Sequence, residues 1–224
     1  MARFTEIGTA IIPGKGTRLR LLQRNDEFSI KIAGTTGELM NSRVHGSEDA
    51  LATLACERIA DQPAPRVLIG GLGMGFTLAA ALSALGEDAR VTVAELVPEV
   101  EDWNRGPLGA AAGNPLDDPR TDVYIGDVAD LLKSSDGEWD AILLDVDNGP
   151  EGLTRKENNW IYSPAGITAA QKSLSPDGIL AYWSASAEHA FTEKLRAAGF
   201  SAEPVTVRGL RPGKGAYHVI WLAW

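Results

Sequence analysis

Short apolar segments alternate with longer helix-like segments over most of the chain, and this alternation constrains the fold more than any other feature. The expected strands are 66–70, 90–96, 121–124, 140–145 and 178–183, and the expected helices include 76–85, 98–103, 128–133, 163–174 and 187–198. Strands that are apolar along their whole length bury both faces, which is typical of a parallel sheet covered by helices on two sides. We therefore predict an α/β domain with a mostly parallel sheet.

The two ends of the chain depart from this alternation. The last two expected strands, 200–207 and 217–224, are joined by a loop too short for a helical crossover, so they should pair antiparallel. At the start, four short strands separated by glycine-containing turns, 9–12, 17–23, 28–32 and 38–41, predict a small antiparallel β element. Ser47 is the expected N-cap of a helix that runs to residue 60. We place the small element at 1–45 and the main domain at 46–224.

A glycine-rich turn joins the first strand of the main domain to the helix that follows. Gly71, Gly73 and Gly75 form a G-x-G-x-G pattern, which lets the backbone turn sharply and approach a ligand. The free N–H groups at the start of the next helix favour a negatively charged group. The dinucleotide fingerprint would require a small residue at Phe76, so the pattern argues against NAD. We interpret the loop as a binding site for another nucleoside cofactor; the alternative is a tight turn without a ligand.

Acidic residues follow three successive strands, at the sheet edge where open α/β folds bind ligands. Glu95 could accept the hydroxyls of a ribose, and Asp127 could hold an adenine amino group or cap the helix at residue 128. Asp145, Asp147 and Asn148 follow the fourth strand. In transfer from S-adenosylmethionine (SAM) an acceptor attacks a carbon bound to sulfonium, so the protein must hold the acceptor and remove its proton. Asp145 and Asp147 are candidates for this role, although either could instead cap a strand or a turn.

A polar stretch, 151–159, separates these acids from an aromatic cluster and has the character of a lid. Trp160 and Tyr162 are candidate substrate-binding residues together with Asn148, because aromatic rings can form a wall for a sulfonium or an amine. Packing against the following helix is the alternative for both aromatic residues.

The net charge and the histidine and cysteine content limit which partners and metal sites are expected. The 30 acidic and 21 basic residues give a net charge of -9, which repels nucleic acid and anionic membranes, so a neutral or cationic small molecule is the expected partner. The chain shows no signal-peptide pattern and no apolar run long enough for a membrane span, so we expect a cytoplasmic protein. The three histidines and the single Cys56 lack ligand spacing, so no metal site is expected.

Several of these features occur together in a known family. The chain resembles the spermidine synthase-like branch of the class I SAM-dependent methyltransferase superfamily over roughly residues 38–224. The resemblance is carried by the order of Ile69-Gly70-Gly71, Glu95, Gly126-Asp127, the segment 139–145 and Tyr162. The resemblance implies a Rossmann-like, mostly parallel seven-stranded sheet with an antiparallel last strand, and a homodimer. It also implies that Glu95 binds ribose, that Asp127 binds adenine, and that Asp145 lies beside the reactive group and the acceptor amine.

The glycine loop departs from the family pattern. Spermidine synthases carry an acid in this loop, within G-G-G-D-G, which holds the amine of decarboxylated SAM, whereas Leu72-Gly73-Met74 stand here. The family's D-S-S-D-P is also altered, to Asp145-Val146-Asp147-Asn148-Gly149-Pro150. On these grounds the sequence favours a methyltransferase that uses intact SAM on a small acceptor such as an amine. An aminopropyltransferase that uses decarboxylated SAM and a catalytically silent nucleoside-binding module are the alternatives.

Overall fold

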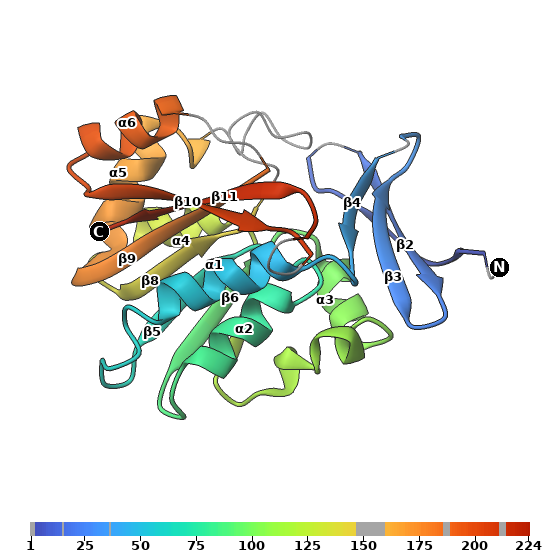
Figure 1. Ribbon diagram of the computed structural model, residues 1–224. Helices are drawn as coiled ribbons and strands as arrows, with labels where there is room; N and C mark the ends of the chain where they lie inside the picture. The colour runs from blue at the N-terminus through green and yellow to red at the C-terminus, as the bar shows by residue number, and fades with distance from the viewer. Residues whose placement is uncertain (1–2, 15, 36, 147–159, 186–188, 211–213) are drawn as a thin grey trace.

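The central feature is a seven-stranded sheet (Figure 1), seen in a computed structural model that describes residues 3–14, 16–35, 37–146, 160–185, 189–210 and 214–224. The strand order is β10-β11-β9-β8-β5-β6-β7. The strands are β5 (Arg66–Gly70), β6 (Arg90–Glu95), β7 (Thr121–Ile125), β8 (Trp139–Leu144), β9 (Leu174–Ser184), β10 (Ala202–Arg208) and β11 (Tyr217–Ala223). The five neighbouring strands β9, β8, β5, β6 and β7 are parallel to one another, and β11 is antiparallel to both of its neighbours, β10 and β9. The predicted sheet is confirmed.

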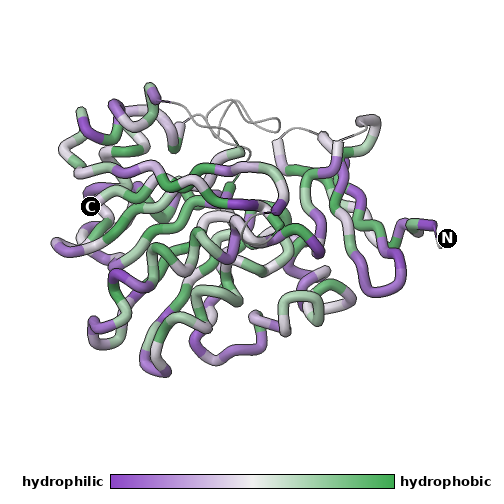
Figure 2. The backbone as a smooth tube through the Cα atoms, viewed as in Figure 1, coloured by the Kyte–Doolittle hydropathy of each residue, from purple (hydrophilic) through white to green (hydrophobic). Residues whose placement is uncertain are grey.

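Helices cover both faces of this sheet. They are α1 (Gly46–Cys56), α2 (Phe76–Ala84), α3 (Pro98–Arg105), α4 (Val128–Ser134), α5 (Pro164–Ser173) and α6 (His189–Ala197). Within β8, Leu143 packs in the core formed with α1 and α2, whereas Leu144 packs in the core formed with α4, α5 and α6. The central strands, such as β5 and β8, are accordingly mostly apolar (Figure 2), as expected for strands buried on both sides of a sheet. No helix in the described ranges is long and apolar enough to cross a membrane.

Two short 3₁₀ helices, η1 (Gly109–Ala112) and η2 (Pro115–Asp117), lie between α3 and β7 and were not predicted. Strand β9 also begins earlier than predicted, at Leu174 instead of residue 178. A register shift accommodates the extra residues, because Trp139 pairs with Leu174 while Ala141 pairs with Ile179.

The N-terminal strands form a second, four-stranded antiparallel sheet in the order β1-β2-β3-β4. They are β1 (Thr5–Ile11), β2 (Arg18–Arg24), β3 (Glu27–Ile32) and β4 (Glu38–Asn41), which confirms the expected β element. Buried residues of this sheet, including Leu19 and Ile30, belong to the same hydrophobic core as α1, α2 and α3. The small sheet stands beside the main sheet (Figure 1). The division of the chain at residue 45 remains a prediction.

The start of α1 differs from the prediction. The helix begins at Gly46, with His45 at the N-cap position, so Ser47 lies inside the helix and does not cap it. The N–H of Gly46 donates to the carbonyl oxygen of Gly209 at 2.7 Å, which ties the first residue of the helix to the segment after β10. The helix ends at Cys56, earlier than expected. The hydroxyl of Ser47 is thereby free to bond to other partners.

Candidate active site

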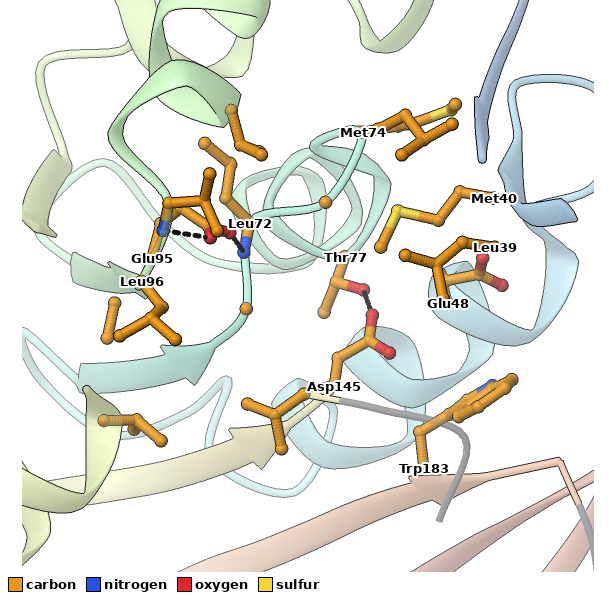
Figure 3. Close-up of a pocket in the computed structure, with 18 of the residues that line it drawn as sticks. Leu39, Met40, Glu48, Leu72, Met74, Thr77, Glu95, Leu96, Asp145 and Trp183 are labelled. Atoms are coloured by element: carbon orange, nitrogen blue, oxygen red, sulfur yellow. Dashed lines mark hydrogen bonds between the residues drawn. The ribbon is translucent and has the colours of Figure 1, made fainter. Parts of the chain in front are cut away.

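A cavity lies between the carboxyl ends of β5, β6 and β8 and the apolar face of the N-terminal sheet (Figure 3). Among the described residues, four acids line it: Glu48, Glu95, Asp127 and Asp145. Its apolar walls come from the small sheet and the helices, and include Ile12, Leu19, Ile30, Leu39, Met40, Phe76 and Val100. The structure thus brings three of the predicted acids to one cavity, as expected for strand ends of a parallel sheet.

Two glycines of the predicted loop line this cavity. Gly71, Gly73 and Gly75 have φ values of 94°, 53° and 81°, a backbone region that favours glycine. A β-carbon at Gly71 would overlap the carbonyl oxygen of Asp145, and one at Gly73 would lie 3.0 Å from Sδ of Met40. Gly75 is the N-cap residue of α2 and does not line the cavity. Gly71 and Gly73 therefore expose backbone to a ligand, whereas Gly75 serves the turn into the helix.

Glu95 anchors the glycine loop. Its Oε2 accepts a hydrogen bond from the N–H of Leu72 at 3.0 Å, and its Oε1 accepts one from the N–H of Val97 at 2.8 Å. Burial raises the pKa of this carboxyl, while these backbone donors act in the opposite direction. The side chain lies at the cavity wall, where the resemblance places a ribose-binding acid, and that binding role remains a prediction.

Asp127 caps the helix that follows it, which was one of its two expected roles, and it also lines the cavity. It is the N-cap residue of α4, and its Oδ1 accepts a hydrogen bond from the N–H of Ala129 at 2.9 Å. A carboxylate oxygen that caps a helix retains further lone pairs for a ligand. Contact with an adenine amino group therefore remains a prediction that capping does not exclude.

Asp145 follows β8 directly and is held in place from two sides. Its N–H donates to the carbonyl oxygen of Gly70 at 2.9 Å, and Oγ1 of Thr77 donates to its Oδ2 at 2.8 Å. Burial raises the pKa of this carboxyl above its usual range, and the hydrogen bond from Thr77 opposes the change. The structure therefore holds Asp145 as a buried carboxyl with a raised proton affinity.

Glu48 is a functional candidate that the sequence did not reveal. It lies in the first turn of α1, a position normally explained by the helix dipole, yet it lines the same cavity as Asp145 (Figure 3). Burial, and then the charge of Asp145, raise the pKa of Glu48 to about 7. Only the packing of α1 on the sheet brings the two acids together, so no local pattern could have indicated this pair.

Trp183 of β9 is a second residue that the sequence did not single out. Its indole lies on the Glu48 and Asp145 side of the cavity (Figure 3). The Nε1 atom is buried and has no hydrogen-bond partner among the described residues. Buried polar groups are nearly always paired, so this N–H is a donor that a bound ligand or water could satisfy.

The two predicted aromatic substrate residues do not line the cavity. Tyr162 is buried between Tyr182 and Phe191, with ring centroids 5.5 and 5.4 Å away, in the core under α5 and α6. The ring of Trp160 lies 4.7 Å from Nζ of Lys133. Packing against the neighbouring helices therefore decides their positions, and Ile161 contributes to the cavity instead.

Asp147 and Asn148, and the lid predicted at 151–159, lie outside the described residues. Their predicted roles are not tested by the structure. The site described so far rests on Asp145, Glu48, Glu95 and Asp127 together with the glycine loop.

Comparison with known proteins gives matches among solved structures only, since no family model and no curated protein sequence matches. A spermidine synthase in complex with the transition-state analogue AdoDATO superposes with a TM-score of 0.73 at 16% identity, covering 99% of this chain and 73% of that one. The spermidine synthase of Thermotoga maritima gives a TM-score of 0.73 at 15% identity, covering 97% and 71%. The chain has the spermidine synthase fold. Coverage of nearly the whole chain means that the spermidine synthase fold here includes the small N-terminal sheet.

These matches correct the preference for methyl transfer. Both structures are spermidine synthases, which supports the aminopropyl alternative better than the methyltransferase reading. The error has a physical reason, because the prediction was based only on residues of the glycine loop and of the segment after the fourth strand. Glu48 supplies a carboxylate to the same cavity from α1, so the neutral loop does not leave the site without acids for a cationic donor.

Proposed function

We propose that this protein is an aminopropyltransferase, which moves an aminopropyl group from decarboxylated SAM to an amine. The observation that carries the proposal is the pair of carboxylates, Glu48 and Asp145, which meet in one cavity next to the glycine loop. The spermidine synthase fold supports the same conclusion.

Charge favours this donor over intact SAM. Decarboxylated SAM presents a sulfonium and an ammonium and no carboxylate, so both of its charges are attracted by Glu48 and Asp145. Intact SAM brings an additional carboxylate that the same acids repel. One charge contact at about 4 Å with an effective dielectric constant of about 20 is worth roughly 4 kcal/mol before desolvation. Two acids in one cavity therefore discriminate between the donors.

The same acids suit the chemistry of the acceptor. An amine must lose a proton before its nitrogen attacks the carbon next to the sulfonium, where a C–N bond forms while the C–S bond breaks and methylthioadenosine leaves. Asp145 is the proposed base for that proton, because burial raises the pKa of its carboxyl. Glu95 and Asp127, with Gly71 and Gly73, are proposed to hold the nucleoside part of the donor.

A donor and acceptor screen tests this proposal. The protein is incubated with decarboxylated SAM and a panel of diamines and monoamines, with intact SAM in parallel, and release of methylthioadenosine is measured. We expect turnover with at least one amine and the decarboxylated donor. Asp145→Asn should lower kcat/KM at least 100-fold, through loss of the base and weaker binding of the cationic donor, whereas Glu57→Gln, at an exposed acid beyond α1, should match the wild type. Absence of methylthioadenosine with every amine would refute the proposal and favour a silent binding module.

A further inference from the structure

The hydroxyl of Ser47 joins Glu48 to His218. Oγ of Ser47 donates a hydrogen bond to Oε2 of Glu48 at 2.6 Å, and Nδ1 of His218 lies 2.8 Å from the same Oγ. Ser47 is fully buried, so its hydroxyl bonds inside the protein. A serine hydroxyl carries a single proton, and here Glu48 receives it. In this arrangement Nδ1 of His218 must therefore carry a proton and donate it to Ser47.

His218 lies on β11, at the opposite end of this chain of hydrogen bonds from the cavity. Its ring is half-buried, packs at 4.9 Å against Trp183 of β9, and therefore retains contact with solvent. Burial lowers the pKa of this imidazole, which favours release of a proton. The three residues thus form a continuous hydrogen-bonded connection from a cavity acid to a ring that contacts solvent.

The other charged groups near these hydrogen bonds have partners of their own. Asp49, next to Glu48 on α1, is hydrogen-bonded to Nδ1 of His45 at 2.8 Å. Arg208, at the end of the neighbouring strand β10, donates to the carbonyl oxygen of Gly215 at 2.9 Å and stacks on the ring of Tyr217. Among the described residues, the charges that act on Glu48 are that of Asp145 across the cavity and, more weakly, that of Asp49 beside it.

We propose that Ser47 and His218 form the outlet through which a proton leaves Glu48 during turnover. The proposal rests on the aminopropyl transfer inferred above, in which each acceptor amine gives one proton to Asp145, and Glu48, which faces Asp145 across the cavity, takes that proton over. The proton on Glu48 passes to Oγ of Ser47, the hydroxyl proton of Ser47 passes to Nδ1 of His218, and the proton on Nε2 leaves to water. The ring is then protonated on Nδ1 and Glu48 is ionised, which is the arrangement of hydrogen bonds in the structure. Proton exchange with water resets the ring.

A structural tie between α1 and β11 would use the same contacts, and one substitution separates the two roles. In His218→Asn the amide NH₂ can still donate to Ser47, but an amide cannot relay a proton. We expect the rate of aminopropyl transfer to fall at least tenfold, with donor KM within twofold of the wild type and a changed pH profile. Free imidazole should restore part of the rate in His218→Ala. His189→Asn, at an exposed histidine of α6, is the matched control. Wild-type kinetics in His218→Asn would overturn the proposal that Ser47 and His218 form a proton outlet.

A second measurement does not depend on activity. The ¹⁵N shifts of the His218 ring, followed against pH in the ligand-free protein, should change together with the protonation of Glu48. This change should disappear in Ser47→Ala and in Glu48→Gln. A His218 titration that is the same in all three proteins would overturn the outlet. If the wild type transfers an aminopropyl group to no amine, the proposed function fails, while the ¹⁵N titration still decides whether the three residues exchange a proton.

Discussion

Oγ1 of Thr77 donates a hydrogen bond to Oδ2 of Asp145 at 2.8 Å, which links the first turn of α2 to the residue that follows β8. The bond stabilises the ionised carboxylate and so lowers the pKa of Asp145 against the effect of burial. Thr77→Val keeps the shape of the side chain and removes the donor. We expect the acidic limb of the kcat/KM profile to move to higher pH by about one unit, since a hydrogen bond is worth about 1 kcal/mol. An unchanged acidic limb of the kcat/KM profile would show that the protonation of Asp145 does not determine this limb.

Gly71 and Gly73 should differ sharply in their tolerance of a side chain. Gly71→Ala places a β-carbon against the backbone carbonyl of Asp145 at a φ of 94°, so neither strain nor overlap can relax without moving β8. We expect a loss of at least about 3 kcal/mol in the free energy of unfolding. Gly73→Ala meets only the flexible end of Met40 at 3.0 Å and should cost about 1–2 kcal/mol. Denaturant unfolding of both variants measures the two losses in the free energy of unfolding. Equal losses would contradict the predicted difference between Gly71 and Gly73.

Much of this architecture follows from local patterns. Apolar strands, the glycine loop and the acids at strand ends are visible in sequence because each depends on neighbouring residues. Glu48, Trp183 and the contact between Ser47 and His218 depend on how α1, β9 and β11 pack, which no local pattern contains. The position of Tyr162 away from the cavity depends on packing as well, since the aromatic core around Tyr182 determines its place.

The pair of cavity acids should make stability depend on pH. The pKa of Glu48 rises from 4.5 to about 7 on folding, so between these values the folded state binds more protons than the unfolded state. The stability contributed by this proton is present at low pH and is lost as pH rises towards 7. In Glu48→Gln the decrease in the free energy of unfolding between pH 5 and pH 8 should shrink by about 1–2 kcal/mol. Glu57→Gln should follow the wild type, and an identical pH dependence in Glu48→Gln would contradict the assignment.

Glu95 should contribute to stability as well as to binding. Both of its oxygens accept backbone hydrogen bonds, from Leu72 and Val97, so Glu95→Gln must leave one buried N–H facing an amide group in place of an oxygen. Because an unpaired buried donor costs about 1–3 kcal/mol, we expect a loss of that size in the ligand-free protein. The glycine loop then loses its anchor, and the affinity for methylthioadenosine, measured by calorimetry, should fall about tenfold or more. An acid that only bound ribose would lower the affinity and leave the unfolding of the ligand-free protein unchanged.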